Sequence, residues 1–427
     1  MKLRGFFLLL PILCLCQELV VSEITHKGNT LTKDYIITRE IQHPVGVPLD
    51  SVIAIEDQNR LINLGIFADI KWRAIPLENK TVRLEYEILE NANFIGGRFF
   101  GGPSPAYDEE TGWSFGVGGV FKNFRGRNEQ IAGGFMVGGR NTFGIGFTNP
   151  WITGDHVSLS MDMGKGEYNH PYLPYTVQLK TVELNVGKYF GEKRKTFIGF
   201  EIEDMDFLND STQLNYQYFA PQGTFIYDSR DLYANPTKGI LLKQAFMGRI
   251  DIKGEVENNF TWFQSYSFYK RLSSLHNSRP WILAAGVKAM MSFGEQDHHF
   301  MGAMGESGSV RGWHYPTHIN YNDPEQSYRF GFHNLKSSVE LRKVIVPRIA
   351  LQNLYEFGVT VSTFIDWGVT SQDKFEDLLR LRPVLGTGIS LQFQVPFVPV
   401  LRLEYGWGFY DGKQMDRAFH LAMVHQI

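Results

Sequence analysis

Apolar and polar residues alternate along this chain from about residue 92 to its end. The clearest segments are 357–367, 385–393 and 401–409, where most apolar residues share one parity and polar residues or glycines share the other. A period of two is typical of β-strands with one apolar face. In water that face must be covered by a second sheet or by helices, yet no amphipathic helix of useful length follows residue 92. A closed barrel that faces lipid explains both observations.

Membrane-spanning strands are about ten residues long, and bacterial barrels have an even number of them. Counting such segments predicts a mainly β fold with roughly sixteen antiparallel transmembrane strands over residues 92–427. We expect the strands to begin near residues 93, 112, 128, 140, 155, 178, 195, 222, 238, 258, 280, 334, 356, 382, 400 and 418. Tryptophans near the expected strand ends fit interfacial aromatic girdles: Trp113, Trp151, Trp281, Trp313 and Trp407.

The composition agrees with a β-rich chain that has many turns. It includes 43 glycines and 14% aromatic residues. The formal charge of −3 and the pI near 6.5 argue against a nucleic-acid-binding protein, which normally carries a basic patch and a high pI. No phosphate loop or nucleotide-binding fingerprint occurs, so we expect no cofactor.

Residues 1–22 resemble an export signal. A charged start, Lys2 and Arg4, precedes an apolar run from Phe6 to Leu15, and Val20 and Ser22 suit the positions before a cleavage site. The apolar run falls short of the ~20 residues that span a bilayer, which disfavours a membrane anchor. The two cysteines, at positions 14 and 16, lie in this segment, so we expect a mature chain without disulfides or thiolate metal sites.

Residues 23–90 have a different pattern, which predicts a small α/β domain of order β-α-α-β-β. Capping and turn residues place a strand at 24–29, helices over 32–41 and 48–64, and a hairpin of strands 66–75 and 81–89. This domain is expected to precede the barrel directly.

The longest expected connection, between the eleventh and twelfth strands, contains Gly308-Ser309-Val310-Arg311-Gly312-Trp313. By itself, a Val-Arg-Gly tripeptide is most often a surface turn with a solvated arginine. If the strands close into a barrel, however, the loop can fold back and place the guanidinium of Arg311 in the interior.

Two further motifs accompany this loop. Asp228-Ser229-Arg230-Asp231 is followed by Asn235-Pro236-Thr237-Lys238-Gly239, whose Asn-Pro and Lys-Gly pairs are turn residues. In Phe364-Ile365-Asp366-Trp367-Gly368, the alternation directs Asp366 towards the barrel interior.

In this order the motifs resemble the BamA/TamA-type outer-membrane assembly and translocation superfamily, also called the surface antigen family. The small domain resembles one of its polypeptide-transport-associated (POTRA) domains, through segments that include Gly46, Leu64, Gly65 and Phe67. The resemblance covers essentially the whole mature chain. The order of the POTRA-like domain, Asp-x-Arg-Asp, Asn-Pro-Thr-Lys-Gly, Val-Arg-Gly-Trp and Phe-x-Asp-x-Gly is specific.

The resemblance implies that Arg311 reaches into the barrel and pairs with Asp366, which pins the loop without catalysing a reaction. It implies an outer-membrane barrel with a periplasmic POTRA domain that inserts or translocates unfolded or secreted polypeptides. Outer-membrane lipids and accessory periplasmic or lipoprotein subunits are the other partners it implies. The family mechanism uses a seam between the first and last strands, and edge strands of the POTRA domain, here 81–89, to receive client strands. The final segment from Ala418 to Ile427 departs from the pattern, because it lacks a glycine and ends without an aromatic residue.

Three other functions remain open. A passive pore or structural barrel would keep this architecture without handling clients. An outer-membrane phospholipase would use His156 and Ser158, which share one strand face but have no evident third polar partner. Asp297-His298-His299 could ligate a metal, but adjacent histidines in a strand point to opposite faces, which favours a loop. We therefore expect no enzymatic activity.

Overall fold

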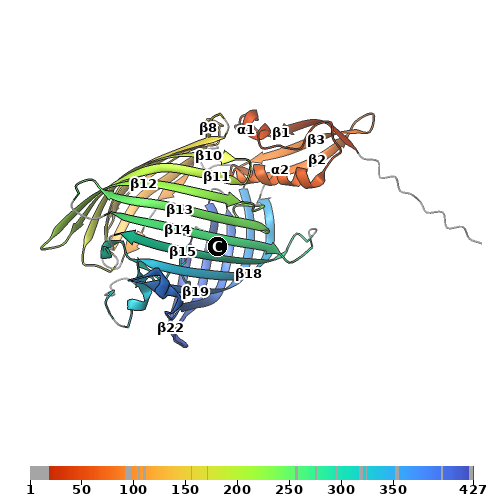
Figure 1. The fold of residues 1–427 in the computed structure, drawn as a ribbon. Coiled ribbons are helices and arrows are strands. Elements are labelled where there is room, and N and C mark those ends of the chain that lie inside the picture. The colour runs from red at the N-terminus through yellow and green to blue at the C-terminus, as the bar shows by residue number, and fades with distance from the viewer. Residues whose placement is uncertain are drawn as a thin grey trace, which may run out of the picture.

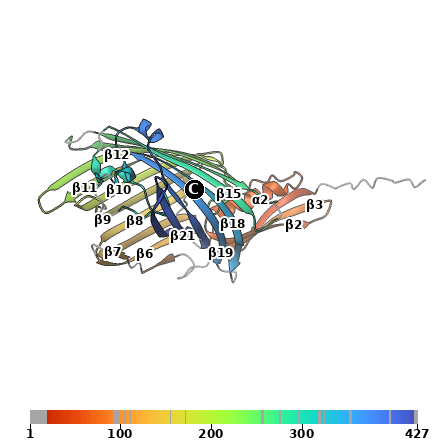
Figure 2. The same cartoon turned by 90° about the horizontal axis from the view of Figure 1, so that it is seen from below.

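The computed structural model describes residues 19–91, 99–103, 106–108, 112–154, 156–170, 172–254, 258–274, 277–294, 297–316, 321–323, 325–351, 355–395, 398–422 and 427. It forms a small N-terminal domain and a large curled sheet, and the domain lies at one end of that sheet in both views (Figures 1 and 2). Residues 1–18 of the expected signal lie outside the described residues, as does the expected first strand start near 93. Among the described residues, no helix is long and apolar enough to cross a membrane.

The N-terminal domain has the predicted order β-α-α-β-β. Its elements are β1 (Val20–Lys27), α1 (Asp34–Thr38), α2 (Ser51–Asn63), β2 (Phe67–Pro76) and β3 (Thr81–Glu90). The side chain of Asp50 caps α2 by accepting from the backbone N–H of Val52 at 2.7 Å. The first helix is shorter than the predicted range 32–41, because Lys33 still has an extended backbone and the helix ends at Thr38.

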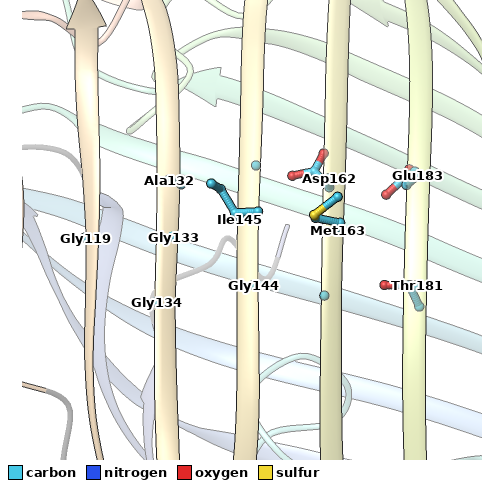
Figure 3. Close-up of a pocket in the computed structure, with 12 residues that line it drawn as sticks. Gly119, Ala132, Gly133, Gly134, Gly144, Ile145, Asp162, Met163, Thr181 and Glu183 are labelled. Atoms are coloured by element: carbon cyan, nitrogen blue, oxygen red, sulfur yellow. The ribbon is translucent and has the colours of Figure 1, made fainter.

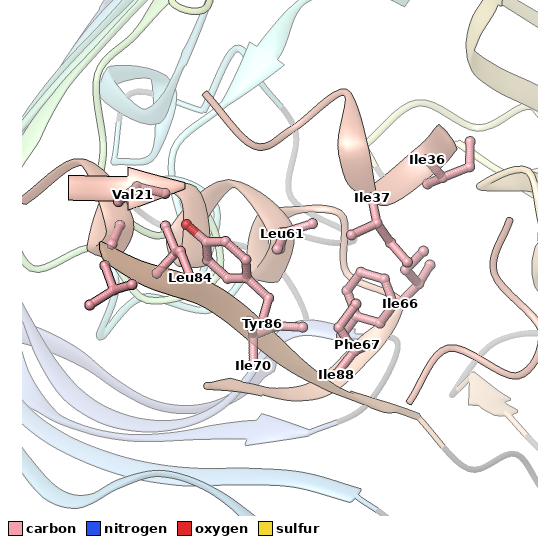
Figure 4. Packing of buried hydrophobic residues seen from close by; sticks show 12 residues of the cluster. Val21, Ile36, Ile37, Leu61, Ile66, Phe67, Ile70, Leu84, Tyr86 and Ile88 are labelled. Carbon is pink, nitrogen blue, oxygen red and sulfur yellow. The ribbon is translucent and has the colours of Figure 1, made fainter. Parts of the chain in front are cut away.

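Apolar side chains from both helices and all three strands form the core of this domain (Figure 4). Asp57 of α2 is fully buried at the edge of this core. Its carboxylate accepts from the hydroxyl of Tyr86 at 2.7 Å and from the backbone N–H groups of Gln42 and His43 at 2.9 and 3.1 Å. These hydrogen bonds satisfy a buried charge that would otherwise be costly.

The strand order of this small sheet is β1-β3-β2, with β1 parallel to β3. Strand β3 is therefore central, and the prediction that residues 81–89 form an exposed edge is wrong. A parallel β1–β3 pair uses the side of β3 that the hairpin leaves open. The outer side of β1 is partly covered, since Val21 exchanges backbone hydrogen bonds with Val47 and Gly46 at 2.9 and 2.7 Å. In the described part of the chain, β2 pairs on one side only.

The large sheet contains sixteen antiparallel strands among the described residues, if β4 and β5, which both pair with β6, count as one. Its strands are β4 (Phe99–Pro103), β5 (Ala106–Asp108), β6 (Gly112–Phe124), β7 (Glu129–Gly138), β8 (Asn141–Thr153), β9 (Val157–Asn169), β10 (Thr176–Phe190), β11 (Arg194–Leu208), β12 (Gln213–Asp228), β13 (Gly239–Asp251), β14 (Asn259–Arg271), β15 (Trp281–Gly294), β18 (His333–Leu351), β19 (Tyr355–Ser371), β20 (Val384–Val395), β21 (Val398–Tyr410) and β22 (Lys413–Ala422). The strand order brings β22 next to β4.

Most predicted strand starts agree with the structure within a few residues, but two do not. β12 begins at Gln213 instead of near 222, and β22 begins at Lys413 instead of near 418. Segment 413–417 has polar residues on both faces, so backbone pairing extends through it without an apolar face. Segment 213–218 does alternate, but its apolar residues Leu214 and Tyr216 pack inwards and its polar residues share the parity of the exposed Phe219, which reverses the pattern of a lipid-facing strand.

The outer face of the sheet carries large apolar side chains, whereas the inner face is polar. Trp113, Phe246, Ile365 and Phe419 are 58%, 53%, 64% and 61% exposed on the outer face. Trp313 does not belong to an outer aromatic girdle, because it is buried in the loop that enters the sheet.

Candidate functional site

The connection between β15 and β18 folds back along the inner face of the sheet. It contains η1 (His298–Phe300), the short paired strands β16 (Gly302–Ala303) and β17 (Phe330–Gly331), and η2 (Ser327–Arg329). Arg329 braces the loop, since its guanidinium donates to the carbonyl of Met304 at 2.9 Å and to that of His314. The segment Val310–Trp313 is buried at the turn of this loop.

Arg311 is fully buried and contacts three carboxylates. Its Nε and Nη2 donate to the two oxygens of Asp366, both at 2.8 Å, and its backbone N–H donates to the same carboxylate at 2.9 Å. Its Nη1 donates to Glu340 at 2.6 Å and to Glu404 at 2.9 Å, and Nη2 also donates to Ser338 at 2.9 Å. The fork of Arg311 and the carboxylate of Asp366 thus form the two-bond pair that gives the strongest and most directional ion pairs.

Strand alternation and register place these partners. Asp366 and Phe364 share the inner face of β19, and they lie opposite Ser338 and Glu340 of β18. The ring of Phe364 lies 3.7 Å from the guanidinium carbon of Arg311, a cation–π contact that adds to the ion pairs.

The charges around Arg311 are balanced. Arg342 donates to Glu340 at 2.6 Å, and Arg402 lies 3.3 Å from Glu404. Together with Arg311 and Asp366 this gives three guanidinium groups and three carboxylates, each at most 1% exposed. Balance matters because a buried ion without its partner loses solvation that nothing replaces. We call these six residues and Ser338 the latch cluster.

Glycines allow the loop to approach the strands closely. Gly312 has φ +87°, a left-handed conformation, and a Cβ there would lie 2.7 Å from backbone atoms of Trp407. A Cβ at Gly386 would overlap the carbonyl of Arg311, and one at Gly368 would lie 2.6 Å from Val310. The glycines of β19 and β20 therefore form the floor against which the loop packs.

Two further hydrogen bonds hold the loop at Gly312 and Trp313. The indole Nε1 of Trp313 donates to the carbonyl of Leu385 at 2.8 Å, and the backbone N–H of Gly312 donates to Nε2 of His420 at 3.2 Å. The structure thus brings all four residues of the predicted Val310–Trp313 motif, with Asp366, Phe364 and Gly368, into one site. Sequence reasoning missed Ser338, Glu340, Arg342, Arg402 and Glu404. The Glu-x-Arg and Arg-x-Glu pairs on predicted inner faces were the available signal.

The second predicted motif forms the β12–β13 turn, away from the latch cluster. Arg230 donates through Nε and Nη2 to Asp228 at 2.9 and 2.8 Å. Asp231 accepts from the backbone N–H of Thr237 at 2.8 Å, which closes the turn. Gly239, at φ +111°, starts β13 where a Cβ would overlap backbone. Asn235 and Pro236 are buried there, and Asn235 donates to Thr360 at 3.0 Å.

This turn contacts the N-terminal domain. Asn63 of α2 donates to the carbonyl of Asp231 at 3.1 Å and accepts from the backbone N–H of Tyr233 at 2.9 Å. The β6–β7 turn and the end of β18 contact the domain as well. The backbone N–H of Lys33 donates to Gly126 at 2.9 Å, and Arg348 donates to the carbonyl of Phe67 at 2.9 Å.

The POTRA-like residues shape the domain. Phe67 is fully buried in its core, and Leu64 packs against that core. Gly46 and Gly65 have φ values of +85° and +68°, so they form turns that other residues rarely adopt.

The alternative chemistries find little support in this geometry. Among the described residues, the hydroxyl of Ser158 is buried without a hydrogen-bond partner, and the ring of His156 lies between those of Trp151 and Tyr189, at 3.9 and 3.7 Å. No base in the described part of the chain is therefore hydrogen-bonded to Ser158 in the way that activates a nucleophile.

The segment 297–299 lies in the loop, as the alternation argument predicts. Asp297 caps η1 and contacts Nδ1 of His299 at 2.5 Å. Among the described residues, no group of three or more His, Cys, Asp or Glu is arranged to hold a metal ion.

Another part of the sheet is rich in glycine. A hollow of about 460 Å³ lies against β6 to β10, and neighbouring strands meet there through glycines that include Gly119, Gly133, Gly134 and Gly144 (Figure 3). Two carboxylates, Asp162 of β9 and Glu183 of β10, also line the hollow. We call this region the glycine wall.

Comparison with known families identifies the class of protein that carries this fold and loop. The Omp85 superfamily domain matches residues 123–425, which is more than half of the chain. The chain therefore belongs to the Omp85 superfamily.

Among its relatives are two proteins named outer membrane protein assembly factor BamA. The one from Nitratidesulfovibrio vulgaris is 22% identical over 431 residues, covering 95% of this chain and 51% of that protein. The one from Neisseria meningitidis is 24% identical over 148 residues, covering 34% and 18%. The chain thus spans about half the length, or less, of these curated relatives.

Solved structures share the fold. BamA from Haemophilus ducreyi, in a form lacking POTRA domains 1–3, matches with a TM-score of 0.55 at 19% identity, covering 94% of this chain and 84% of that one. CdiB from Acinetobacter baumannii matches with a TM-score of 0.52 at 11% identity, covering 94% and 72%.

Proposed function

We propose that this chain is an outer-membrane barrel protein that inserts or translocates other polypeptides. The observation that carries the proposal is the buried Arg311, held by Asp366 inside a sixteen-stranded Omp85 sheet. The loop closes the interior while it is latched, so polypeptide handling would be coupled to its release. A relative named outer membrane protein assembly factor BamA supports a role in handling other polypeptides.

In this proposal the curled sheet is a closed barrel whose seam lies between β4 and β22. The apolar outer face and charged inner face support it, because open sheet edges are not stable in lipid. The glycine wall of β6 to β10 begins beside this seam in the strand order. Glycine within strands weakens them, so this part of the barrel would deform more readily than the latch side.

The N-terminal domain acts as a single POTRA domain in the periplasm, at the end of the barrel where it contacts the strand turns. Its expected role is to receive client segments, and β2 is the strand that offers a partly unpaired edge. Outer-membrane lipids, unfolded or secreted clients and accessory subunits are the partners of this proposal.

The test is replacement of Arg311 with alanine in cells that depend on this protein. We expect lower levels of other outer-membrane proteins, measured by quantitative proteomics of purified outer membranes. The matched control is Arg382→Ala, which removes an arginine that is 65% exposed. Normal client levels after depletion of the protein itself would refute client handling.

The second candidate function is a passive pore or structural barrel, favoured only by the departures in the last strand. β22 contains no glycine among its residues Lys413–Ala422. Conductance in planar bilayers, together with unchanged client levels on depletion, would establish this function instead.

A further inference from the structure

Two glutamines occupy the outer face of the sheet midway along β13 and β14. Gln244 and Gln264 are paired directly across these strands. The side chains of the same parity are apolar and exposed, including Phe246, Phe260 and Phe268 at 53%, 50% and 44%. Alternation therefore directs both glutamines outwards as well. Polar side chains in this position are rare because lipid offers them few partners, and they often mark a function.

A short chain of hydrogen bonds links these glutamines. The indole Nε1 of Trp262 donates to Oε1 of Gln244 at 2.6 Å, and Nε2 of Gln244 donates to the hydroxyl of Tyr266. That hydroxyl donates to Oε1 of Gln264 at 2.8 Å. Within the described part of the chain, Nε2 of Gln264 donates no hydrogen bond. The series thus ends at the side-chain amide of Gln264, on the outer face of β14.

A hollow adjoins these polar groups on the same outer face. Its volume is about 350 Å³, with a floor that includes Pro221, Gly223 and Gly248. Aromatic rings form its rim, and two of them, Phe246 and Trp262, stack with centroids 5.4 Å apart. A bare floor beside projecting rings gives the surface both a recess and a ridge.

We propose that this outer face of β12 to β15 is a contact between two copies of this chain, related by a two-fold axis through Gln264. The inference goes beyond polypeptide handling and requires only that the outer face meets lipid. Gln264 lies near the middle of β14 (Asn259–Arg271), where lipid hydrocarbon offers no acceptor. An acceptor at that depth must come from protein.

A second copy supplies that acceptor without any further partner. The side-chain amide has both a donor and an acceptor, so two Gln264 residues at a two-fold axis can exchange a pair of hydrogen bonds. Two-fold contacts of this kind use the same surface patch on both copies. Strands β12 to β15, which carry this face, lie side by side in the sheet (Figure 1).

Cysteine crosslinking in membranes tests the contact. Cys14 and Cys16, the two cysteines of the sequence, are first replaced by serine. Ala289→Cys then places a thiol beside Gln264 on β15, and Ile365→Cys, on the outer face of β19, is the matched control. Oxidation should give a dimer of this chain with Ala289→Cys and little with Ile365→Cys. Equal crosslinking at both positions, or a crosslink to a different protein, would overturn the proposal.

Dimer affinity in detergent, measured by sedimentation over a dilution series, tests the role of the amide. Gln264→Leu should raise the dimer Kd about threefold for each hydrogen bond lost, or about eightfold for two, from the ~0.6 kcal/mol average in membranes. Tyr266→Phe removes the hydrogen bond within the chain but keeps the free amide, so its Kd should stay near that of the parent. Heat-modified migration on gels confirms that each variant is folded. An unchanged Kd in Gln264→Leu would refute the proposed contact.

Discussion

Replacement of Arg311 with alanine should release the loop from the interior of the sheet. The latch cluster then holds three carboxylates and two guanidiniums, so one buried negative charge lacks a partner. Removing one member of a buried ion pair costs about 3–5 kcal/mol. If the loop escapes that cost by undocking, the ratio of undocked to docked loop rises roughly 10²- to 10⁴-fold.

The undocked population can be measured with a thiol placed inside the loop. Ser309 is 5% exposed, and Ser309→Cys changes its volume little. A water-soluble maleimide should label this thiol slowly when Arg311 is present. When reclosing is faster than labelling, the rate follows the open population. Arg311→Ala should then raise the labelling rate by at least about 100-fold.

Two companion variants separate charge from shape. Arg311→Lys keeps the charge but loses the two-bond fork to Asp366, so it should label at an intermediate rate. Arg311→Ala combined with Glu340→Gln leaves two cations and two carboxylates, so it should recover part of the protection. A labelling rate of Arg311→Ala within about threefold of the parent rate, a difference worth less than 1 kcal/mol, would show that Arg311 does not hold the loop.

Three further predictions concern other parts of the chain. Burial would raise the pKa of Glu90, but hydrogen bonds from the Thr32 and Thr30 segment lower it below its usual value. The ionised Glu90 therefore contributes fully to the free energy of unfolding above its unfolded pKa, and this contribution is lost as pH falls through its folded pKa. In urea denaturation at a series of pH values, the stability of Glu90→Gln should fall less with acid than that of the parent. Gly312→Ala should raise loop labelling at least tenfold, whereas Gly46→Ala, with similar φ but open space around it, should not alter labelling. The expected cleavage after Ser22 would remove Val21, which is fully buried in β1. Mass spectrometry should therefore find a mature chain that starts before Val21, and a start at Glu23 would contradict this placement.

The alternation of residues was enough to predict the sixteen strands and the inward direction of Asp366, whereas the pairing of Arg311 with Asp366 was implied by the family resemblance. It could not predict the other carboxylates, because Glu340 and Glu404 come from strands that are not neighbours and meet only through the loop. The family resemblance implies only the pair of Arg311 with Asp366, whereas the charge balance also depends on carboxylates from β18 and β21.

The order of strands in the N-terminal domain was also beyond the sequence pattern. Residues 81–89 alternate as an edge strand would, and the hairpin with β2 follows from the turn at 78–80. The parallel pairing of β1 with β3 joins segments about sixty residues apart. Local pattern carries no signal for such a pair, because its stability arises from the shared core with α2.

The position of β18 and β19 links the two ends of the proposed mechanism. These paired strands carry Ser338, Glu340 and Asp366 of the latch cluster, and β18 also carries Arg348, which donates to the carbonyl of Phe67 in the N-terminal domain. Between these contacts β18 bulges, with register shifts between Val344 and Ile349. A bulge lets a strand bend without breaking its pairing. Movement of the N-terminal domain can therefore bend this hairpin below the latch cluster, and such bending would change the spacing between the carboxylates that hold Arg311.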